Sequence, residues 1–148
     1  MKIVLFQPEI PQNTGNIVRT CSVTGVELIL VEPLGFSIND RWLKRAGLDY
    51  WDEVKITLVP NLEELLIKEA PDFYFFSSKA TKNYAQVQYT KDAWLIFGSE
   101  TTGLPDRFKE LWPDKFVSIP MKKDARCLNL ANSASIAIYE AWRQHGFA

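Results

Sequence analysis

Short apolar runs recur along the chain, separated by segments whose apolar residues have helical spacing. Several of the runs are almost uninterrupted, as expected for strands that are covered on both faces of a sheet. The pattern predicts strands at residues 2–7, 27–31, 53–59, 72–76, 94–98 and 116–120.

Four helices are predicted between these strands, at residues 16–24, 62–69, 105–112 and 129–144. Asn61 followed by Glu64 has the spacing of an N-terminal capping box, and Pro71 ends the helix that follows. Strands and helices that alternate in this way predict an α/β fold, with a largely parallel sheet and helices on both faces. We expect one domain over residues 1–148, with its ligands beyond the carboxyl ends of the strands.

The composition suits a single domain with its own core, since 47% of the 148 residues are hydrophobic. No apolar run in the sequence approaches the roughly 18 residues that a membrane span needs. The apolar start at residues 3–6 is too short for a signal peptide, and no small-residue cleavage site follows it. The sequence therefore predicts a cytoplasmic protein with no membrane segment.

Reactive side chains are few. Cys21 and Cys127 do not make a disulfide framework or a metal cluster. The one histidine, His145, lies close to the end of the chain, which argues against His-based acid–base or Ser-His-Asp chemistry. Any general base must then be Asp, Glu, Lys, Arg or a group of the substrate.

The net charge of −1 argues against nonspecific nucleic-acid binding by the whole surface. A local basic patch is an alternative to a plain solvated face, because cations gather in the second half of the chain. These cations are Lys79, Lys82, Lys91, Arg107, Lys109, Lys115, Lys122, Lys123 and Arg126.

The loop that follows the first strand is stiffened by two prolines. Asn13, Thr14 or Asn16 can cap the helix predicted at residues 16–24. Arg19 then falls in the first turn of that helix, where a cation opposes the helix dipole. Pairing with a phosphate or carboxylate would offset this cost, whereas the alternative is a capped helix with an exposed arginine.

Two later loops have unusual contents. Residues 95–105 form a strand, a glycine-containing loop and a helix start, but they lack a P-loop and a dinucleotide fingerprint. Glu100 in this loop suits a cationic or hydroxyl-bearing ligand better than a pyrophosphate. The third loop runs into a helix start at residues 128–137 that is crowded with Asn, Ser and Ala. Such small residues permit close approach of a ligand or a second helix, or else a tightly packed buried helix.

Taken in this order, the three loops resemble the three signature motifs of the SPOUT (SpoU–TrmD) methyltransferases. Within that superfamily, three segments resemble the tRNA (cytidine/uridine-34) 2′-O-methyltransferases: PEIPQNTGN at residues 8–16, RAGLDY at 45–50 and GSETTGLP at 98–105. The resemblance covers essentially the whole chain, which has no added RNA-binding domain. It implies a SPOUT fold with a C-terminal trefoil knot, and a homodimer whose active site uses residues of both subunits.

The resemblance also implies S-adenosyl-L-methionine as the cofactor and no metal. Ala80 joins the expected cofactor contacts because it follows the strand at residues 72–76. The expected cofactor-binding residues are Ala80, Gly98, Glu100, Ile119, Met121, Leu128 and Ser133. The expected catalytic residues around the reacting ribose are Arg19, Asn13, Glu100 and Asn129. Cys127 departs from the pattern, since many relatives carry Ser there, and we expect it to be a structural substitute.

The function implied is 2′-O-methylation of the ribose at the wobble position, nucleotide 34, in the anticodon stem-loop of tRNA. The alternatives are the same reaction at another tRNA position or on rRNA, and a noncatalytic RNA- or cofactor-binding knot protein. A nucleotide-binding α/β protein is a third class, and the missing phosphate loop argues against it.

Two expectations concern Arg19 and the dimer. Arg19 matches the residue that the family uses as its proposed base, but an arginine stays protonated. Binding the adjacent phosphate and stabilising the alkoxide is the less demanding role, and the sequence leaves both open.

The dimer interface is expected at the helices starting at Asn16 and Asn129. A face of small residues permits close helix approach there, extended by Ile138, Tyr139 and Trp142. The small residues are Ala131, Ala134, Ser135 and Ala137.

Overall fold

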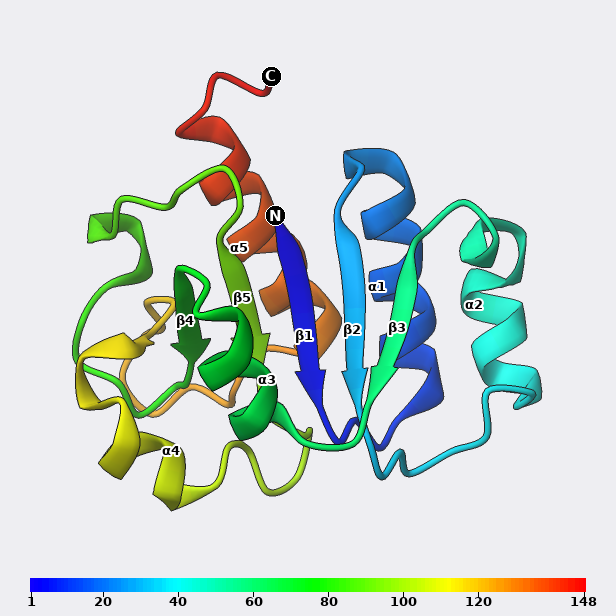
Figure 1. The fold of residues 1–148 in the computed structure, drawn as a ribbon, viewed down its shortest axis with the longest axis horizontal. Coiled ribbons are helices and arrows are strands. Elements are labelled where there is room, and N and C mark those ends of the chain that lie inside the picture. Colours follow the sequence, from blue (N-terminus) through cyan, green and yellow to red (C-terminus); the bar gives the residue numbers. More distant parts are fainter.

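Six strands form one parallel sheet in the computed structural model (Figure 1). They are β1 (Lys2–Phe6), β2 (Glu27–Val31), β3 (Ile56–Val59), β4 (Phe73–Phe76), β5 (Trp94–Phe97) and β6 (Phe116–Val117). Their order in the sheet is β3-β2-β1-β5-β4-β6, and every neighbouring pair is parallel. The predicted parallel sheet is therefore confirmed. The structure describes residues 1–148 except the side chains of residues 47 and 48, so that part of the 45–50 motif lies outside the described residues.

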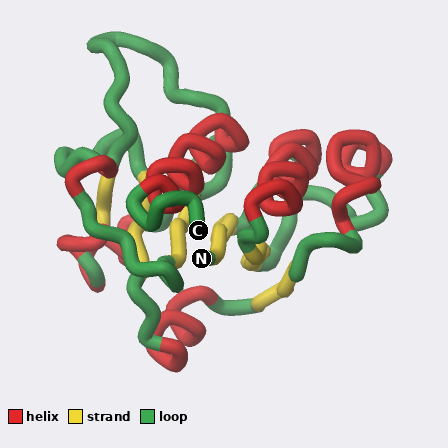
Figure 2. The backbone as a smooth tube through the Cα atoms, turned by 90° about the horizontal axis from the view of Figure 1, so that it is seen from above, coloured by secondary structure: helices red, strands yellow, loops and turns green.

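The helices cover both faces of the sheet, as predicted (Figure 2). They are α1 (Pro11–Thr24), α2 (Arg41–Trp51), α3 (Leu62–Glu69), α4 (Asp106–Leu111) and α5 (Leu130–Arg143), with short 3-10 turns η1 (Tyr84–Gln86) and η2 (Pro113–Lys115). The helices α1, α2 and α5 pack on one face, and α3 and α4 pack on the other. Of the helices in the described part of the chain, none is long and apolar enough to cross a membrane.

Two strands, β3 and β6, are each three residues shorter than predicted. The backbone N–H groups of Glu53 and Val54 bond back to Tyr50 and Trp51, so these residues form a turn after α2 and β3 begins at Ile56. Buried Val54 made the turn look like strand in the sequence pattern. The last strand ends at Val117, because only its first two residues pair with β4.

The start of α1 differs from the prediction. The helix begins at Pro11, whose fixed φ suits the first turn, and Ile10 occupies the N-cap position without a side-chain cap. Asn13 and Asn16 therefore lie inside the helix, and their predicted capping role is wrong. Arg19 lies in the third turn of the helix, so the argument from an unfavourable first-turn charge is also wrong.

The helix α2 was not predicted, although the sequence carries a signal for it. Asp40 is its N-cap, and the carboxylate accepts a hydrogen bond from the backbone N–H of Trp42 at 2.7 Å. Apolar residues then follow at helical spacing, including Leu43, which is 1% exposed, and Tyr50. A cap residue followed by this spacing would have located the helix.

The small residues of α5 serve the chain's own core. Ala131, Ala134 and Ala137 are buried under the sheet and α1, and Ser135 lies 3.1 Å from the hydroxyl of Thr20 on α1. Small side chains let α1 and α5 approach closely within one chain. Ala131, Ala134, Ala137 and Ile138 are therefore buried within the chain and not available to a second subunit, whereas a dimer interface at α1 and α5 stays a prediction.

Candidate functional site

A cavity of about 610 Å³ opens beyond the carboxyl ends of β4, β5 and β6. Residues that follow these three strands line it, together with Ile10, Asn13 and the start of α5. Parallel strands bring their following loops to one edge of the sheet, so segments far apart in sequence meet there. All seven residues expected to bind the cofactor lie in its lining: Ala80, Gly98, Glu100, Ile119, Met121, Leu128 and Ser133.

The loop after β5 is closed on itself. Ser99 and Gly103 exchange two backbone hydrogen bonds, with N···O distances of 3.3 and 3.0 Å, and the hydroxyls of Ser99 and Thr102 lie 2.6 Å apart. A Cβ atom on Gly98 would lie 2.3 Å from the carbonyl carbon of Gly103, so only glycine fits this approach of backbone to backbone.

Glu100 connects this loop to the entrance of α1. One carboxylate oxygen, Oε2, accepts hydrogen bonds from the backbone N–H groups of Glu9 at 2.7 Å and Ile10 at 3.2 Å. The hydroxyl of Thr101 donates to the carboxylate of Glu9 at 2.6 Å, which makes a second connection. The other oxygen of Glu100, Oε1, is buried without a hydrogen-bond partner among the described side chains. Glu100 therefore holds the loop before α1 and leaves one buried acceptor unpaired in the wall of the cavity.

Asn13 and Asn129 join the starts of α1 and α5. The side-chain amide nitrogen of Asn129 donates a hydrogen bond to the side-chain oxygen of Asn13 at 2.9 Å, and Asn13 is buried. The side-chain oxygen of Asn129, Oδ1, accepts hydrogen bonds from the backbone N–H groups of Ala131 and Asn132, at 2.9 and 3.3 Å. Asn129 thus caps α5 with one end of its amide and fixes Asn13 with the other, and both residues line the cavity.

These two roles of Asn129 can be separated by mutation. Asn129→Ser retains a side-chain cap for α5 but loses the donor to Asn13, so we expect nearly parental stability and reduced activity. Asn129→Ala loses both roles and should lower the free energy of unfolding by about 1 kcal/mol. Thermal denaturation and a single-turnover activity assay of the two variants check this. Parental activity in Asn129→Ser, with losses of stability and activity in Asn129→Ala alone, would show that Asn129 acts only through the cap.

Arg19 does not lie in the cavity of its own chain. Its side chain is exposed on α1, and the guanidinium lies 5.4 Å from the ring centroid of Tyr50 on α2. Six residues separate Arg19 from Asn13, a rotation of roughly 240° about the helix axis, so the two point in different directions. The structure brings together Asn13, Glu100 and Asn129 but leaves Arg19 apart from them.

The two cysteines differ sharply in environment. Cys21 lies on the buried face of α1 and is fully buried, and burial raises the pKa of its thiol to about 12, so it stays protonated. Cys127 is exposed at the cavity, and its thiol lies 3.5 Å from the hydroxyl of Ser78.

Sequence reasoning missed Ser77 and Ser78 as cavity residues. Their position directly after a buried strand was the available signal.

Of the nine cations noted in the second half of the chain, Lys79 and Lys109 line the cavity. Both side chains are exposed. Glu100 and Asp106 also line the cavity, so its wall carries charges of both signs, and the two lysines are the groups in it that can contact an anionic part of a substrate. The described Asp, Glu, His and Cys side chains form no group of three that could hold a metal ion.

Known proteins are similar to this chain in both sequence and architecture. A tRNA (cytidine(34)-2'-O)-methyltransferase from Saccharophagus degradans is 46% identical over 148 residues, which cover 99% of this chain and 96% of the relative. A solved structure concerned with the 2-OH methylation of C/U34 on tRNA has a TM-score of 0.90 and 37% identity, and covers 99% of this chain and 97% of its own. The structure of the SpoU methyltransferase AviRb from Streptomyces viridochromogenes, in complex with the cofactor AdoMet, has a TM-score of 0.86 and 26% identity. The match covers 98% of this chain and 57% of the AviRb chain.

Residues 1–139, which include every strand and the cavity-lining part of α5, match the SpoU rRNA Methylase family. The match spans more than nine-tenths of the chain. The chain therefore belongs to the SpoU methylase family.

Proposed function

We propose that this protein transfers a methyl group from S-adenosyl-L-methionine to the ribose 2′-hydroxyl of nucleotide 34 in tRNA. The observation that carries the proposal is the convergence of the seven expected cofactor-binding residues with Asn13 and Asn129 around one cavity. The name of the relative at 46% identity and the neighbour concerned with C/U34 support the choice of substrate. A tRNA substrate in turn implies a cytoplasmic protein.

The cavity suits the cofactor in size and chemistry. Its volume of about 610 Å³ lies within the range of roughly 300–1,000 Å³ that is usual for small-molecule sites. Ile119, Met121 and Leu128 offer an apolar surface for an adenine ring. Glu100 lines the cavity, and a rotation of its side chain would present the unpaired oxygen to a hydroxyl or amino group of the ligand. When bound, the cofactor supplies a methyl group that its sulfonium already activates.

The chain's own residues must orient the ribose and manage its proton. The bonded pair of Asn13 and Asn129 presents a fixed polar wall at the cavity, which can hold the ribose in line for attack. The guanidinium group of Arg19 suits the phosphate beside the ribose and the oxygen that becomes negative during transfer. The phosphate or a water molecule would then receive the proton.

Because Arg19 lies away from its own cavity, we infer that it completes the cavity of a second subunit. Its exposure and its contact with Tyr50 support this arrangement, since the guanidinium is held on the outer surface of α1. The functional unit would then be a homodimer with two composite sites. An isolated subunit would bind cofactor but would not place Arg19 at the ribose.

The expected dimer contact is an exposed ring cluster at the end of α5. Tyr139, which is 45% exposed, packs edge-on against Trp142, and Trp142 packs against Phe147. Burying such rings is a strong drive for association. We expect sedimentation to show a dimer at micromolar concentration, and Tyr139→Glu to shift it toward monomer. A parental protein that sediments as a monomer would contradict the composite site.

The trefoil knot belongs to the same proposal. After β6 at the edge of the sheet, residues 118–129 return past the carboxyl ends of β4 and β5 to reach α5 (Figure 1). Residues of this return and of the loops after β4 and β5 line one cavity. We infer that the returning segment threads between these loops, so that the cofactor would bind against the knot itself.

The decisive test combines ligand binding with mapping of the product. Calorimetry should show binding of S-adenosyl-L-methionine and none of ATP or NAD. Incubation with an anticodon stem-loop and labelled cofactor should place the methyl group on the ribose of nucleotide 34, and a 2′-deoxy nucleotide at that position should abolish transfer. Methylation only at another tRNA position or on rRNA would support the alternative substrate, and cofactor binding without transfer would support a noncatalytic protein.

A further inference from the structure

The first half of α2 carries an exposed indole beside two guanidinium groups. Trp42 is 39% exposed, and the guanidinium carbons of Arg41 and Arg45 lie 5.0 and 5.2 Å from its ring centroid. A large aromatic ring left this exposed gains little for the fold. Flat guanidinium groups over an aromatic ring form a platform on which a further planar group can stack.

The charges around this indole are not neutralised. Arg41, Lys44 and Arg45 are exposed, and none of them forms an ion pair with any side chain that the structure describes. They lie in the first turns of α2, where the helix dipole disfavours cations, and that first turn contains no acidic residue. The nearby carboxylate of Asp40 already caps the helix. We call Arg41, Trp42, Lys44 and Arg45 the α2 cationic surface, and helix stability does not account for it.

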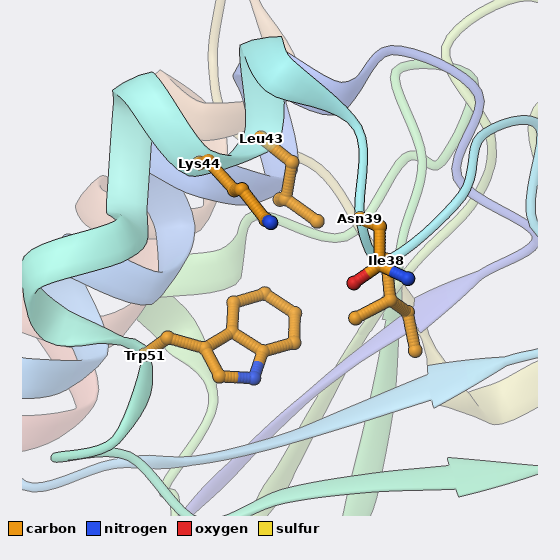
Figure 3. A pocket seen from close by; sticks show the side chains of 5 residues that line it. All are labelled: Ile38, Asn39, Leu43, Lys44 and Trp51. Atoms are coloured by element: carbon orange, nitrogen blue, oxygen red, sulfur yellow. The ribbon is translucent and has the colours of Figure 1, made fainter.

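A small cavity adjoins this surface (Figure 3). It has a volume of about 130 Å³ and is lined by Ile38, Asn39, Leu43, Lys44 and Trp51. This is well below the roughly 300 Å³ at which sites for whole small molecules begin. An occupant would therefore be one part of a larger molecule. The indole of Trp51 and the amide of Asn39 offer a flat apolar wall and a hydrogen-bonding group, a combination that suits a heterocyclic base.

The position of α2 relates this surface to the reaction. Tyr50 on the same helix holds Arg19, and Trp42 lies eight residues earlier, roughly 12 Å along the helix axis. If Arg19 meets the phosphate beside the reacting ribose, the RNA strand would pass along α2 within a few nucleotides of that ribose. The α2 cationic surface lies on the subunit that supplies Arg19, outside the cavity that binds cofactor.

We propose that the α2 cationic surface binds the unpaired RNA strand next to the reacting nucleotide. One base stacks on the Trp42 platform, and Arg41, Lys44 and Arg45 contact the phosphates beside it. Unpaired loops are the part of an RNA whose bases can turn outward and stack on aromatic and arginine side chains. Charge complementarity favours a polyanion, and the indole between the cations favours a strand with free bases over a duplex. The identity of the RNA rests on the proposed function.

The test measures RNA affinity of the intact protein by fluorescence anisotropy with an anticodon stem-loop. We expect Trp42→Ala to weaken binding roughly tenfold, the usual size for removing the aromatic ring under one stacked base, and Trp42→Phe to restore most of it. The double variant Arg41→Ala/Arg45→Ala should reduce the slope of log affinity against log salt by roughly 1.4, because each phosphate neutralised on a single strand adds about 0.7 to that slope. Matched controls are Ile67→Ala and Lys68→Ala, which alter exposed residues of α3 on the opposite face of the sheet.

The outcomes separate this proposal from the proposed function. Cofactor affinity and thermal stability should stay parental in all variants, because the altered side chains are exposed and lie outside the cofactor cavity. If the parental protein methylates nucleotide 34 while the α2 variants keep parental affinity and salt slope, the α2 proposal is wrong and the function stands. If the parental protein binds the stem-loop through Trp42 but transfers no methyl group, the function fails and the RNA surface stands.

Discussion

Arg19→Ala should lower the rate of methyl transfer by roughly two to three orders of magnitude, the usual size for removing one electrostatic interaction with a transition state. Fold and cofactor affinity should be almost unchanged. Arg19 is exposed and lies outside the cavity, and its interaction with Tyr50 is worth only about 0.5–1 kcal/mol at an exposed site. Arg19→Lys should restore only part of the rate, because lysine retains the charge but not the planar fork.

Single-turnover assays on an anticodon stem-loop measure this effect, with sedimentation and cofactor titration as controls on the same variants. A proteolysis check confirms that both variants are folded. If both variants transfer methyl groups at close to the parental rate, Arg19 is only a surface residue that packs on Tyr50, and the composite site is wrong.

Gly98→Ala should abolish cofactor binding, with an affinity loss of at least about a hundredfold. The new Cβ would lie 2.3 Å from the carbonyl carbon of Gly103 and 2.5 Å from the nitrogen of Leu104. Both neighbouring atoms belong to the backbone, so no side-chain rotation can relieve the clash and the closed loop from Ser99 to Gly103 must open. That loop carries Glu100, so the connection to the start of α1 should loosen as well.

Gly25→Ala is the matched control, because a Cβ at Gly25 meets no atom within 4 Å. Its positive φ of 71° makes alanine cost about 1 kcal/mol or slightly more, without any effect near the cavity. Calorimetric titration of both variants with S-adenosyl-L-methionine distinguishes a local effect from general destabilisation. Parental affinity in Gly98→Ala would show that the loop after β5 does not form the cofactor site.

The two variants together test whether the site is composite. In a dimer that pairs Arg19→Ala with Gly98→Ala, one cavity is intact and the neighbouring subunit supplies an intact Arg19. Mixing the two inactive proteins and allowing subunits to exchange should restore roughly one quarter of the parental rate, because half of the dimers are mixed and each has one complete site. If Arg19 served its own cavity, the mixture would stay inactive.

Local patterns in the sequence were enough for much of the architecture. Apolar runs located all six strands, and the continuous character of β1, β2 and β5 indicated a parallel sheet covered on both faces. The cap at Asn61 located α3 to the residue, since its side chain accepts from the backbone of Glu64 as expected. Signals of this kind act within a few residues, so they can be read without knowing what packs where.

The same local signals failed where the chain offered competing ones. Asn13, Thr14 and Asn16 have the side chains of N-cap residues. However, Pro11 is the first residue of α1, so all three lie inside the helix. The small residues of α5 are compatible with any close helix packing, and only the tertiary structure showed that α1 of the same chain uses them. A pattern that permits close approach does not identify the partner.

The sequence determined which elements form and which residue types could carry the chemistry, because both follow from spacing and side-chain properties. Tertiary structure alone decided which of them meet. The parallel sheet brings Ala80, Gly98 and Leu128 to one cavity from loops after different strands. The turn of α1 sends Asn13 into that cavity and Arg19 away from it, toward Tyr50 on α2. Convergence and separation of this kind depend on strand order and helix rotation across the whole fold, which no segment encodes by itself.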